Sequence, residues 1–233
     1  MGHPTFEALQ TDPELIDKLV AQARRERARA IGTFITGTVR RLFGRLTLRP
    51  GAQQAHAAED AAGISIRPAG SGDREGIQAF VRGLSPRSRY LRFFSGVREL
   101  PPQWLDRFAR PASERELTLL ALARDDGREI PVAMAQYATG PDHRGEFAVV
   151  VTDEWQGKGI GKRLIHELAC IARGEGLVRL EGDVLAENGR MLRMAGALGI
   201  AFERDPENPA ALRASLSLSD PRWQCERPLL QAA

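Results

Sequence analysis

The strongest constraint on this chain is a glycine-rich turn between a predicted strand and a predicted helix. Residues 146–173, EFAVVVTDEWQGKGIGKRLIHELACIAR, contain a β-branched run at 149–152 and continue as an amphipathic helix from Gly159. Glycines at 157, 159 and 161 remove side chains from the turn, so consecutive backbone N–H groups can face one anion at the positive end of the helix. The sequence therefore predicts that this turn binds a ligand carrying phosphate.

Two other phosphate-binding motifs do not fit this turn. A dinucleotide-binding G-x-G-x-x-G is absent, because Gly157, Gly159 and Gly161 occupy every second position. A G-x-x-x-x-G-K-[ST] motif cannot be drawn through the same residues either. The pattern that does fit is Q-x-x-G-x-G over residues 156–161.

The order of predicted elements favours an α+β fold. A strand at 64–68 is followed by helices at 71–84, 85–94 and 102–109, and then by a hairpin over 117–139. A strand from Glu146 and the helix from Gly159 come next. The chain continues with a strand at 178–185, a helix at 189–198 and strands near 201–203 and 212–218. Early hairpins and a late strand-helix-strand unit predict a mixed sheet with flanking helices.

The Q-x-x-G-x-G pattern resembles the pyrophosphate-binding signature of the GNAT N-acetyltransferases. The stretch from Asn188 to Ile200 is similar to the next helix of that family and the glycine after it, and the upstream order of elements agrees. The segment SPRSRYLRFF, residues 85–94, is similar to a segment of bacterial protein-lysine acetyltransferases. The resemblance covers about two-thirds of the chain. It implies a GNAT-like twisted, mostly antiparallel sheet and an acetyl-CoA-dependent N-acetyltransferase.

The resemblance also implies which residues contact the cofactor. In the family the fourth and fifth strands separate, and main-chain groups of the fourth strand pair with the pantetheine arm of acetyl-CoA. The matching residues here are Val149, Val150 and Val151. The N–H groups of Gly157, Lys158, Gly159, Ile160, Gly161 and Lys162 are expected to bind the pyrophosphate. Gln156, the first residue of the signature, is also expected to bind the cofactor, and Asn188 matches a position near the cofactor arm.

Transfer of acetyl to an amine needs a base, because a lysine-like amine with a pKa of about 10.4 is mostly protonated at neutral pH. Glu146 resembles the position where many members of the family have a catalytic glutamate; an ordinary surface glutamate is the alternative. Backbone N–H groups near Val149 are expected to stabilise the oxyanion. Many members have a tyrosine as general acid on the last helix, whereas this chain has Ala195 at the matching position. Which group replaces that tyrosine is left open.

The N-terminal part differs from the predicted domain. Residues 12–46 are predicted as a helix, and residues 14–50 carry nine Lys or Arg against three Asp or Glu. Such a basic amphipathic helix can self-associate, contact an anionic surface or nucleic acid, or dock on its own domain. We divide the chain into a helical extension and linker at 1–62, a GNAT domain at 63–219 and a tail at 220–233.

Composition excludes several classes of protein. No apolar run reaches about 18 residues, so we expect no transmembrane segment. The first residues lack the apolar core of a secretory signal, which favours the cytoplasm. Two distant cysteines and four scattered histidines predict no metal site. The expected partners are acetyl-CoA and an amine acceptor, with a protein lysine favoured. A small-amine acetyltransferase and a non-catalytic acyl-CoA sensor are the alternatives, and the acceptor and oligomeric state are left open.

Overall fold

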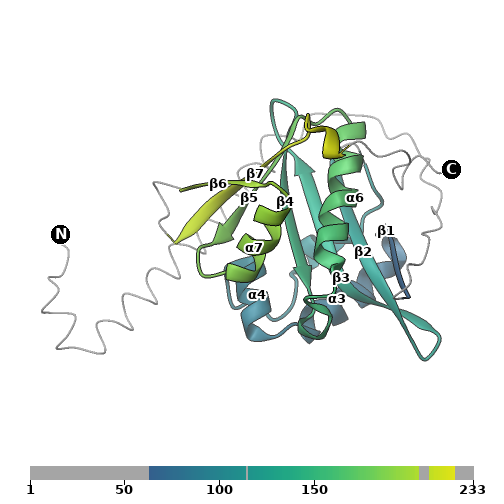
Figure 1. The fold of residues 1–233 in the computed structure, drawn as a ribbon. Coiled ribbons are helices and arrows are strands. Elements are labelled where there is room, and N and C mark those ends of the chain that lie inside the picture. Colours follow the sequence, from purple (N-terminus) through teal and green to yellow (C-terminus); the bar gives the residue numbers. More distant parts are fainter. Residues whose placement is uncertain (1–62, 114, 205–209, 224–233) are drawn as a thin grey trace, which may run out of the picture. The chain divides into compact units, whose positions relative to one another are not determined.

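The computed structural model describes residues 63–113, 115–204 and 210–223. Within these residues, seven strands form one sheet in the order β1-β2-β3-β4-β5-β7-β6, with helices on both faces (Figure 1). The α+β class predicted from the sequence is confirmed. The predicted helix at 12–46 and the basic segment at 14–50 lie outside the described residues.

The observed elements agree with the predicted ones to within a few residues at each end. The strands are β1 (Ile64–Pro68), β2 (Glu116–Asp125), β3 (Arg128–Thr139), β4 (Arg144–Val151), β5 (Arg179–Leu185), β6 (Ala201–Arg204) and β7 (Ala211–Ser217). The helices are α3 (Arg74–Gly83), α4 (Pro86–Phe93), α5 (Pro102–Phe108), α6 (Ile160–Gly174) and α7 (Gly189–Ala197). Single 3₁₀ turns are η1 (Ser71–Asp73), η2 (Asp153–Trp155) and η3 (Pro221–Trp223).

Local chemistry accounts for the β2–β3 hairpin. Asp126 and Gly127 at its tip both have positive φ angles, of 46° and 78°. A two-residue turn with this geometry matches the right-handed twist of the strands that it joins. The sheet is antiparallel at every pair of neighbouring described strands except β4 and β5, which run parallel.

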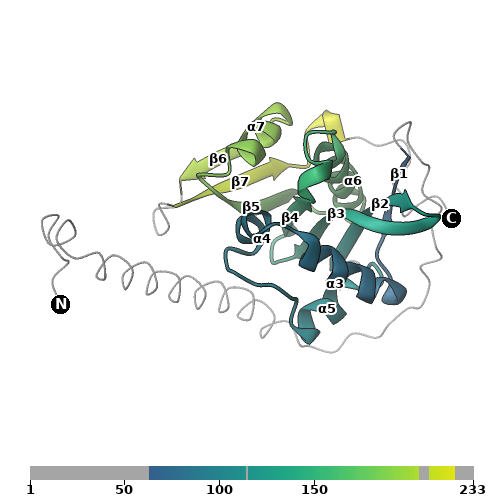
Figure 2. The ribbon, with the colours of Figure 1, turned by 90° about the horizontal axis from the view of Figure 1, so that it is seen from below.

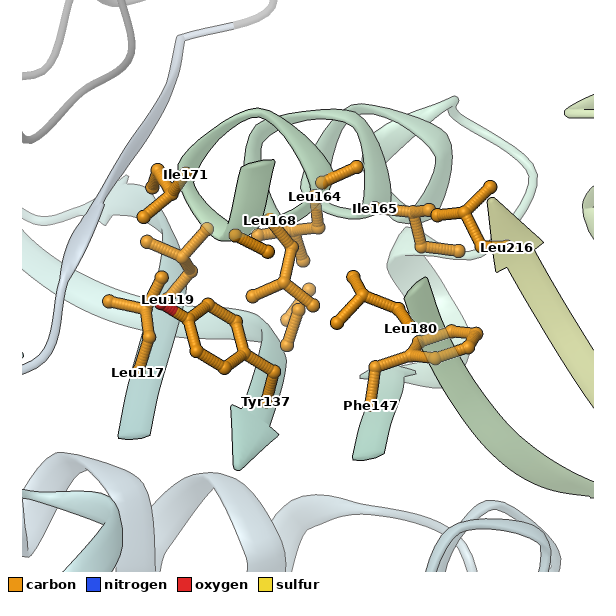
Figure 3. Packing of buried hydrophobic residues seen from close by; sticks show 14 of the residues in the cluster. Leu117, Leu119, Tyr137, Phe147, Leu164, Ile165, Leu168, Ile171, Leu180 and Leu216 are labelled. Atoms are coloured by element: carbon orange, nitrogen blue, oxygen red, sulfur yellow. The ribbon is translucent and has the colours of Figure 1, made fainter. Parts of the chain in front are cut away.

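Two apolar clusters lie on opposite faces of the sheet. Helices α3, α4 and α5 cover one face, and α6 and α7 cover the other (Figure 2). Helix α6 repeats apolar residues at helical spacing, and its buried side chains point at the sheet (Figure 3). They are Leu164, Ile165, Leu168 and Ile171, which face Leu117, Leu119, Tyr137, Phe147, Leu180 and Leu216. Strand β2 is apolar without alternation because both of its faces are covered.

The C-terminal end of the described chain packs on α6. Trp223 in η3 is 2% exposed, belongs to the same apolar cluster as α6, and has its ring centroid 5.8 Å from that of His166. The packed core thus includes a residue after position 219, where the sequence places the end of the domain. Among the helices that the structure describes, none combines the length and the apolar composition needed to cross a membrane.

Candidate functional site

The sheet opens between β4 and β5. The two strands pair only from Arg144 to Glu146, which lie opposite residues 179–181. Beyond that point β4 stays paired with β3 as far as Val151, and β5 stays paired with β7 as far as Leu185. Strands β4 and β5 therefore separate beyond Glu146, and the edge of β4 that faces β5 borders a gap between the two strands.

The direction of the peptide groups decides which part of β4 faces this gap. The N–H of Thr152 donates to the carbonyl of Val132 in β3, at 2.9 Å. Peptide groups of successive residues in a strand point to opposite edges, so those of Val150 point to β3 and those of Val149 and Val151 point to β5. The carbonyl of Val151 accepts a hydrogen bond from the Gln156 amide at 2.9 Å. Of the three valines predicted to present main-chain groups, Val149 is therefore the best placed.

The glycine-rich turn leaves the N-terminus of α6 open. Gly157 and Gly159 have φ angles of 82° and 85°, a region that side chains rarely adopt. Gly159 is the N-cap residue, and no side chain caps the helix. The first N–H groups of the helix have no partner within it, and Lys158 and Lys162 are exposed beside them. This end can hold an anion such as a diphosphate.

The third glycine of the turn has a packing role. Gly161 is buried, and a Cβ added to it would lie 3.0 Å from the sulfur of Met194 and 3.6 Å from a methyl group of Val151. Glycine at 161 thus allows α6 to pack closely on α7. The sequence pattern alone does not separate this role from contact with phosphate.

The side chain of Gln156 is occupied within the protein. Its amide nitrogen donates to the carbonyl of Val151 and, at 3.2 Å, to the hydroxyl of Ser88 in α4. Its amide oxygen accepts from Arg190 in α7. The first residue of the Q-x-x-G-x-G pattern therefore connects β4, α4 and α7 around the turn.

A second polar cluster fastens the start of α4 to the same turn. Ser85 is the N-cap of α4, and its hydroxyl accepts from the N–H of Ser88 at 3.1 Å. Asp153 in η2 accepts from the N–H and hydroxyl of Ser85 and, at 2.9 Å, from the hydroxyl of Ser88. Burial alone would raise the pKa of Asp153, but these hydrogen bonds lower it below its ordinary value.

A pocket lies where β4 and β5 separate. Its lining comes from these two strands, from Leu91, Arg92 and Phe94 at the end of α4, and from Asn188 and Met191 at the start of α7. The Asn188 oxygen accepts from the N–H of Met191 at 3.1 Å, so Asn188 also caps α7.

Ala195 does not line this pocket. It is fully buried among the apolar residues between α7 and the sheet. Its methyl group therefore takes part in core packing. Position 195 therefore holds a core residue without a titratable group.

Glu146 is the last residue of β4 with a partner in β5, and it lies where the gap begins. By surface area the Glu146 side chain is exposed, but enough protein lies around its carboxyl group that desolvation raises its pKa. Asp183 raises this pKa further. The guanidinium groups of Arg92, Arg213 and Arg107 oppose the increase. The result is a carboxylate with a higher proton affinity than an ordinary glutamate, as a general base requires.

Two features of the site were not predicted from the sequence. Gly182 in β5 lies so close to β4 that a Cβ would be 2.6 Å from the carbonyl oxygen of Phe147. A glycine in the interior of a strand is a signal of such close approach. Gln136, 8% exposed, is a buried polar residue in apolar β3, and such a residue is expected to be hydrogen-bonded.

No set of three or more His, Cys, Asp or Glu side chains that could bind a metal ion is present among the described residues.

Comparisons with known proteins agree with this geometry. The model of the Acetyltransferase (GNAT) family matches residues 85–200. The acetyltransferase PA5475 of Pseudomonas aeruginosa is 30% identical over 161 residues, which are 69% of this chain and 87% of the relative.

Solved structures with the same fold include the GNAT domain of S. lividans PAT. It has a TM-score of 0.60 and 25% identity, over 66% of this chain and 90% of that one. The structure of yncA from Salmonella typhimurium, with its cofactor acetyl-CoA, has a TM-score of 0.53 and 17% identity. The similarity covers 67% of this chain and 95% of yncA.

Proposed function

Because this chain belongs to the GNAT family of acetyltransferases, we propose that it transfers acetyl from acetyl-CoA to a lysine-type amine of a protein, with Glu146 as the general base. The observation that carries the proposal is the position of Glu146. Its carboxylate belongs to the last paired position of β4, where the strand edge opens. A base at this point lies beside the first main-chain groups that can hold a thioester.

The proposed step begins with a protonated amine. The Glu146 carboxylate accepts a proton from the ammonium group, and the free amine then attacks the thioester carbon. The new C–N bond forms as the C–S bond breaks, and coenzyme A leaves as a thiolate. The nitrogen then loses its second proton to solvent, which leaves a neutral amide. The N–H of Val149 points toward the gap and is suited to stabilise the oxyanion. Ala195 has no proton to donate, so thiolate departure does not rely on that position.

The proposed cofactor contacts are at the unpaired edge of β4 and at the uncapped N-terminus of α6. Val149 supplies main-chain groups to the pantetheine arm, with Val150 and Val151 as its neighbours in the strand. The diphosphate lies at the turn from Gly157 to Lys162, where N–H groups without a partner inside α6 and two exposed lysines offer positive charge. Gln156 and Asn188 are assigned a supporting role, because their side chains fix α4 and α7 at the edges of the site.

The choice of a protein lysine as acceptor rests on α4. The segment SPRSRYLRFF is the part of the sequence that resembles protein-lysine acetyltransferases, and its Leu91, Arg92 and Phe94 line the pocket. The likeness to the GNAT domain of S. lividans PAT supports the same choice.

The test is thiol release from acetyl-CoA against a panel of proteins, polyamines and amino acids. We expect transfer to protein lysines. Glu146→Gln should lower kcat by at least about 10²-fold while the affinity for acetyl-CoA, measured by calorimetry, stays within a factor of about two. Glu203→Gln is the matched control, because Glu203 is an exposed strand glutamate in β6.

Each alternative gives a different result in this test. Release only with polyamines or amino acids would assign a small-amine acetyltransferase. Binding of acetyl-CoA without release for any acceptor would favour a non-catalytic sensor. Unchanged turnover of Glu146→Gln would remove this residue from the mechanism.

A further inference from the structure

We propose that Arg92 is a positioning residue of this site, whose guanidinium is held so that its positive charge acts on the Glu146 carboxylate beside the gap between β4 and β5. The inference rests on the proposed role of Glu146 as base and adds a residue from a different element, α4. Arg92 is not proposed to react. It acts through the electric charge that it brings to the carboxylate.

The guanidinium of Arg92 is fixed by a buried chain of hydrogen bonds. Its Nη2 donates to the Gln136 side-chain oxygen at 2.5 Å, and the Gln136 amide nitrogen donates to the Thr118 hydroxyl at 3.1 Å. Gln136 and Thr118 are 8% and 6% exposed. Because both ends of the amide are used, the glutamine cannot turn without losing a buried hydrogen bond. Arg92 is therefore tied to β3 and β2.

The strand register places this anchor close to Glu146. Glu146 lies opposite Ala138 of β3, and Gln136 lies two residues from Ala138 along the same strand. Side chains two apart in a strand share a face, so Gln136 and Glu146 are diagonal neighbours on the face that α4 covers. The anchor thus brings the cation of Arg92 to the side of the sheet where the Glu146 carboxylate lies.

A nearby anion stabilises the charged form of Arg92. Its Nε is buried, and no hydrogen-bond partner for it is present among the described residues. Burial lowers the pKa of Arg92 to about 10, and the negative charge of Glu146 opposes this change. The guanidinium therefore remains cationic at neutral pH. A buried cation that is incompletely hydrogen-bonded is stabilised by a carboxylate close to it.

The other charges near Glu146 are already paired. Asp183 binds Arg213 at 2.8 Å, and Glu116 binds Arg107 at 2.9 Å. In the same region, Glu181 has three arginine neighbours within 4 Å, namely Arg144, Arg179 and Arg213.

Arg92 differs from these arginines because its hydrogen-bond partner is a neutral amide. The positive charges of Arg213 and Arg107 are partly cancelled at Glu146 by the carboxylates that they bind. The charge of Arg92 has no such cancellation through Gln136. Of the cations that act on Glu146, Arg92 is therefore the one with the largest net effect.

The test is a titration of the Glu146 carboxyl carbon by NMR in the full chain, with Glu146→Gln used to identify its signal. In Arg92→Gln the midpoint should move to higher pH by about one unit, because an attractive charge is lost. Arg92→Lys keeps the charge and should restore most of the wild-type midpoint. Asp183→Asn removes a repulsive charge and should move the midpoint to lower pH.

The amide spectrum of each variant reports whether the fold is retained. An unmoved midpoint in folded Arg92→Gln would overturn the proposal, and so would an equal upward shift in Arg92→Lys. The titration needs no acceptor and no turnover. A fully active Glu146→Gln enzyme would therefore refute the proposed base without changing the titration result. Conversely, an unmoved midpoint in Arg92→Gln would refute the role of Arg92 without changing the evidence for the base.

Discussion

Replacing Gly182 by alanine tests the close contact that shapes the gap. The added Cβ would lie 2.6 Å from the carbonyl oxygen of Phe147 and 3.3–3.4 Å from two carbons of its ring. The oxygen belongs to the backbone of β4, which β3 holds in register, so it cannot turn aside as a flexible side chain can. The strands have to separate until this distance reaches ordinary van der Waals contact, at 3.4 Å or more.

The separation of the strands lowers the stability of the fold, because the added methyl group overpacks the site. Inserting a methyl group into a site that cannot give way costs about 1–3 kcal/mol of stability. For a domain of this size each kcal/mol lowers Tm by about 2–4 °C. Gly182 and Phe147 both line the pocket, so the variant should also bind acetyl-CoA more weakly.

Thermal unfolding and calorimetry with acetyl-CoA measure the two effects. The matched control is Gly196→Ala in α7, where a Cβ would meet nothing within 4 Å. This change should raise stability by about 0.4–1 kcal/mol, because it restricts the unfolded chain. A Gly182→Ala protein that melts at the wild-type temperature would refute the claim that β5 depends on this close approach.

Two further predictions concern the glycine-rich turn and its link to α4. Gly159→Ala should lower the free energy of unfolding by about 1–2 kcal/mol, because φ at this position is 85°. No neighbour lies within 4 Å of the added Cβ, so the loss comes from the backbone conformation alone. Chemical denaturation checks this, and Gly159→Asn should lose less; equal losses would contradict the conformational reason. The lowered pKa of Asp153 means that its contribution to stability is present above the ordinary Asp pKa and is lost as pH falls through its folded-state value. The free energy of unfolding is measured with urea from pH 7 to about pH 3. At pH 7 it should be about 1 kcal/mol lower in Asp153→Asn than in the wild type, and the variant should lack the fall in stability that comes from protonation of Asp153. Identical pH profiles would show that the hydrogen bonds from Ser85 and Ser88 do not stabilise α4.

Much of the fold and of the site is readable from single segments. The helix from Ile160 and its glycine-rich turn are marked by apolar spacing and by residues that permit positive φ, both of which are local properties. The same holds for the hairpin at Asp126 and Gly127. The pattern that first points to the family, Q-x-x-G-x-G, also lies within one continuous stretch, residues 146–173. These features depend on neighbours within a few positions, which a sequence displays directly.

Other parts of the site depend on residues that are distant in the chain. Gln156 binds Ser88 and Arg190, and Arg92 reaches Gln136, so their roles exist only after the elements have packed. No periodicity reports which hydrogen-bond partner a side chain will find.

The amino-acid sequence by itself determined the order of strands and helices, the open turn before α6 and the candidate base at Glu146. Only the tertiary structure decided that β4 and β5 part after three pairs, which leaves Val149 rather than Val150 facing the gap. The physical reason is that register and close approach are set by contacts across the sheet. The approach of Gly182 to Phe147 is one such contact, and it becomes visible only when both strands are in place.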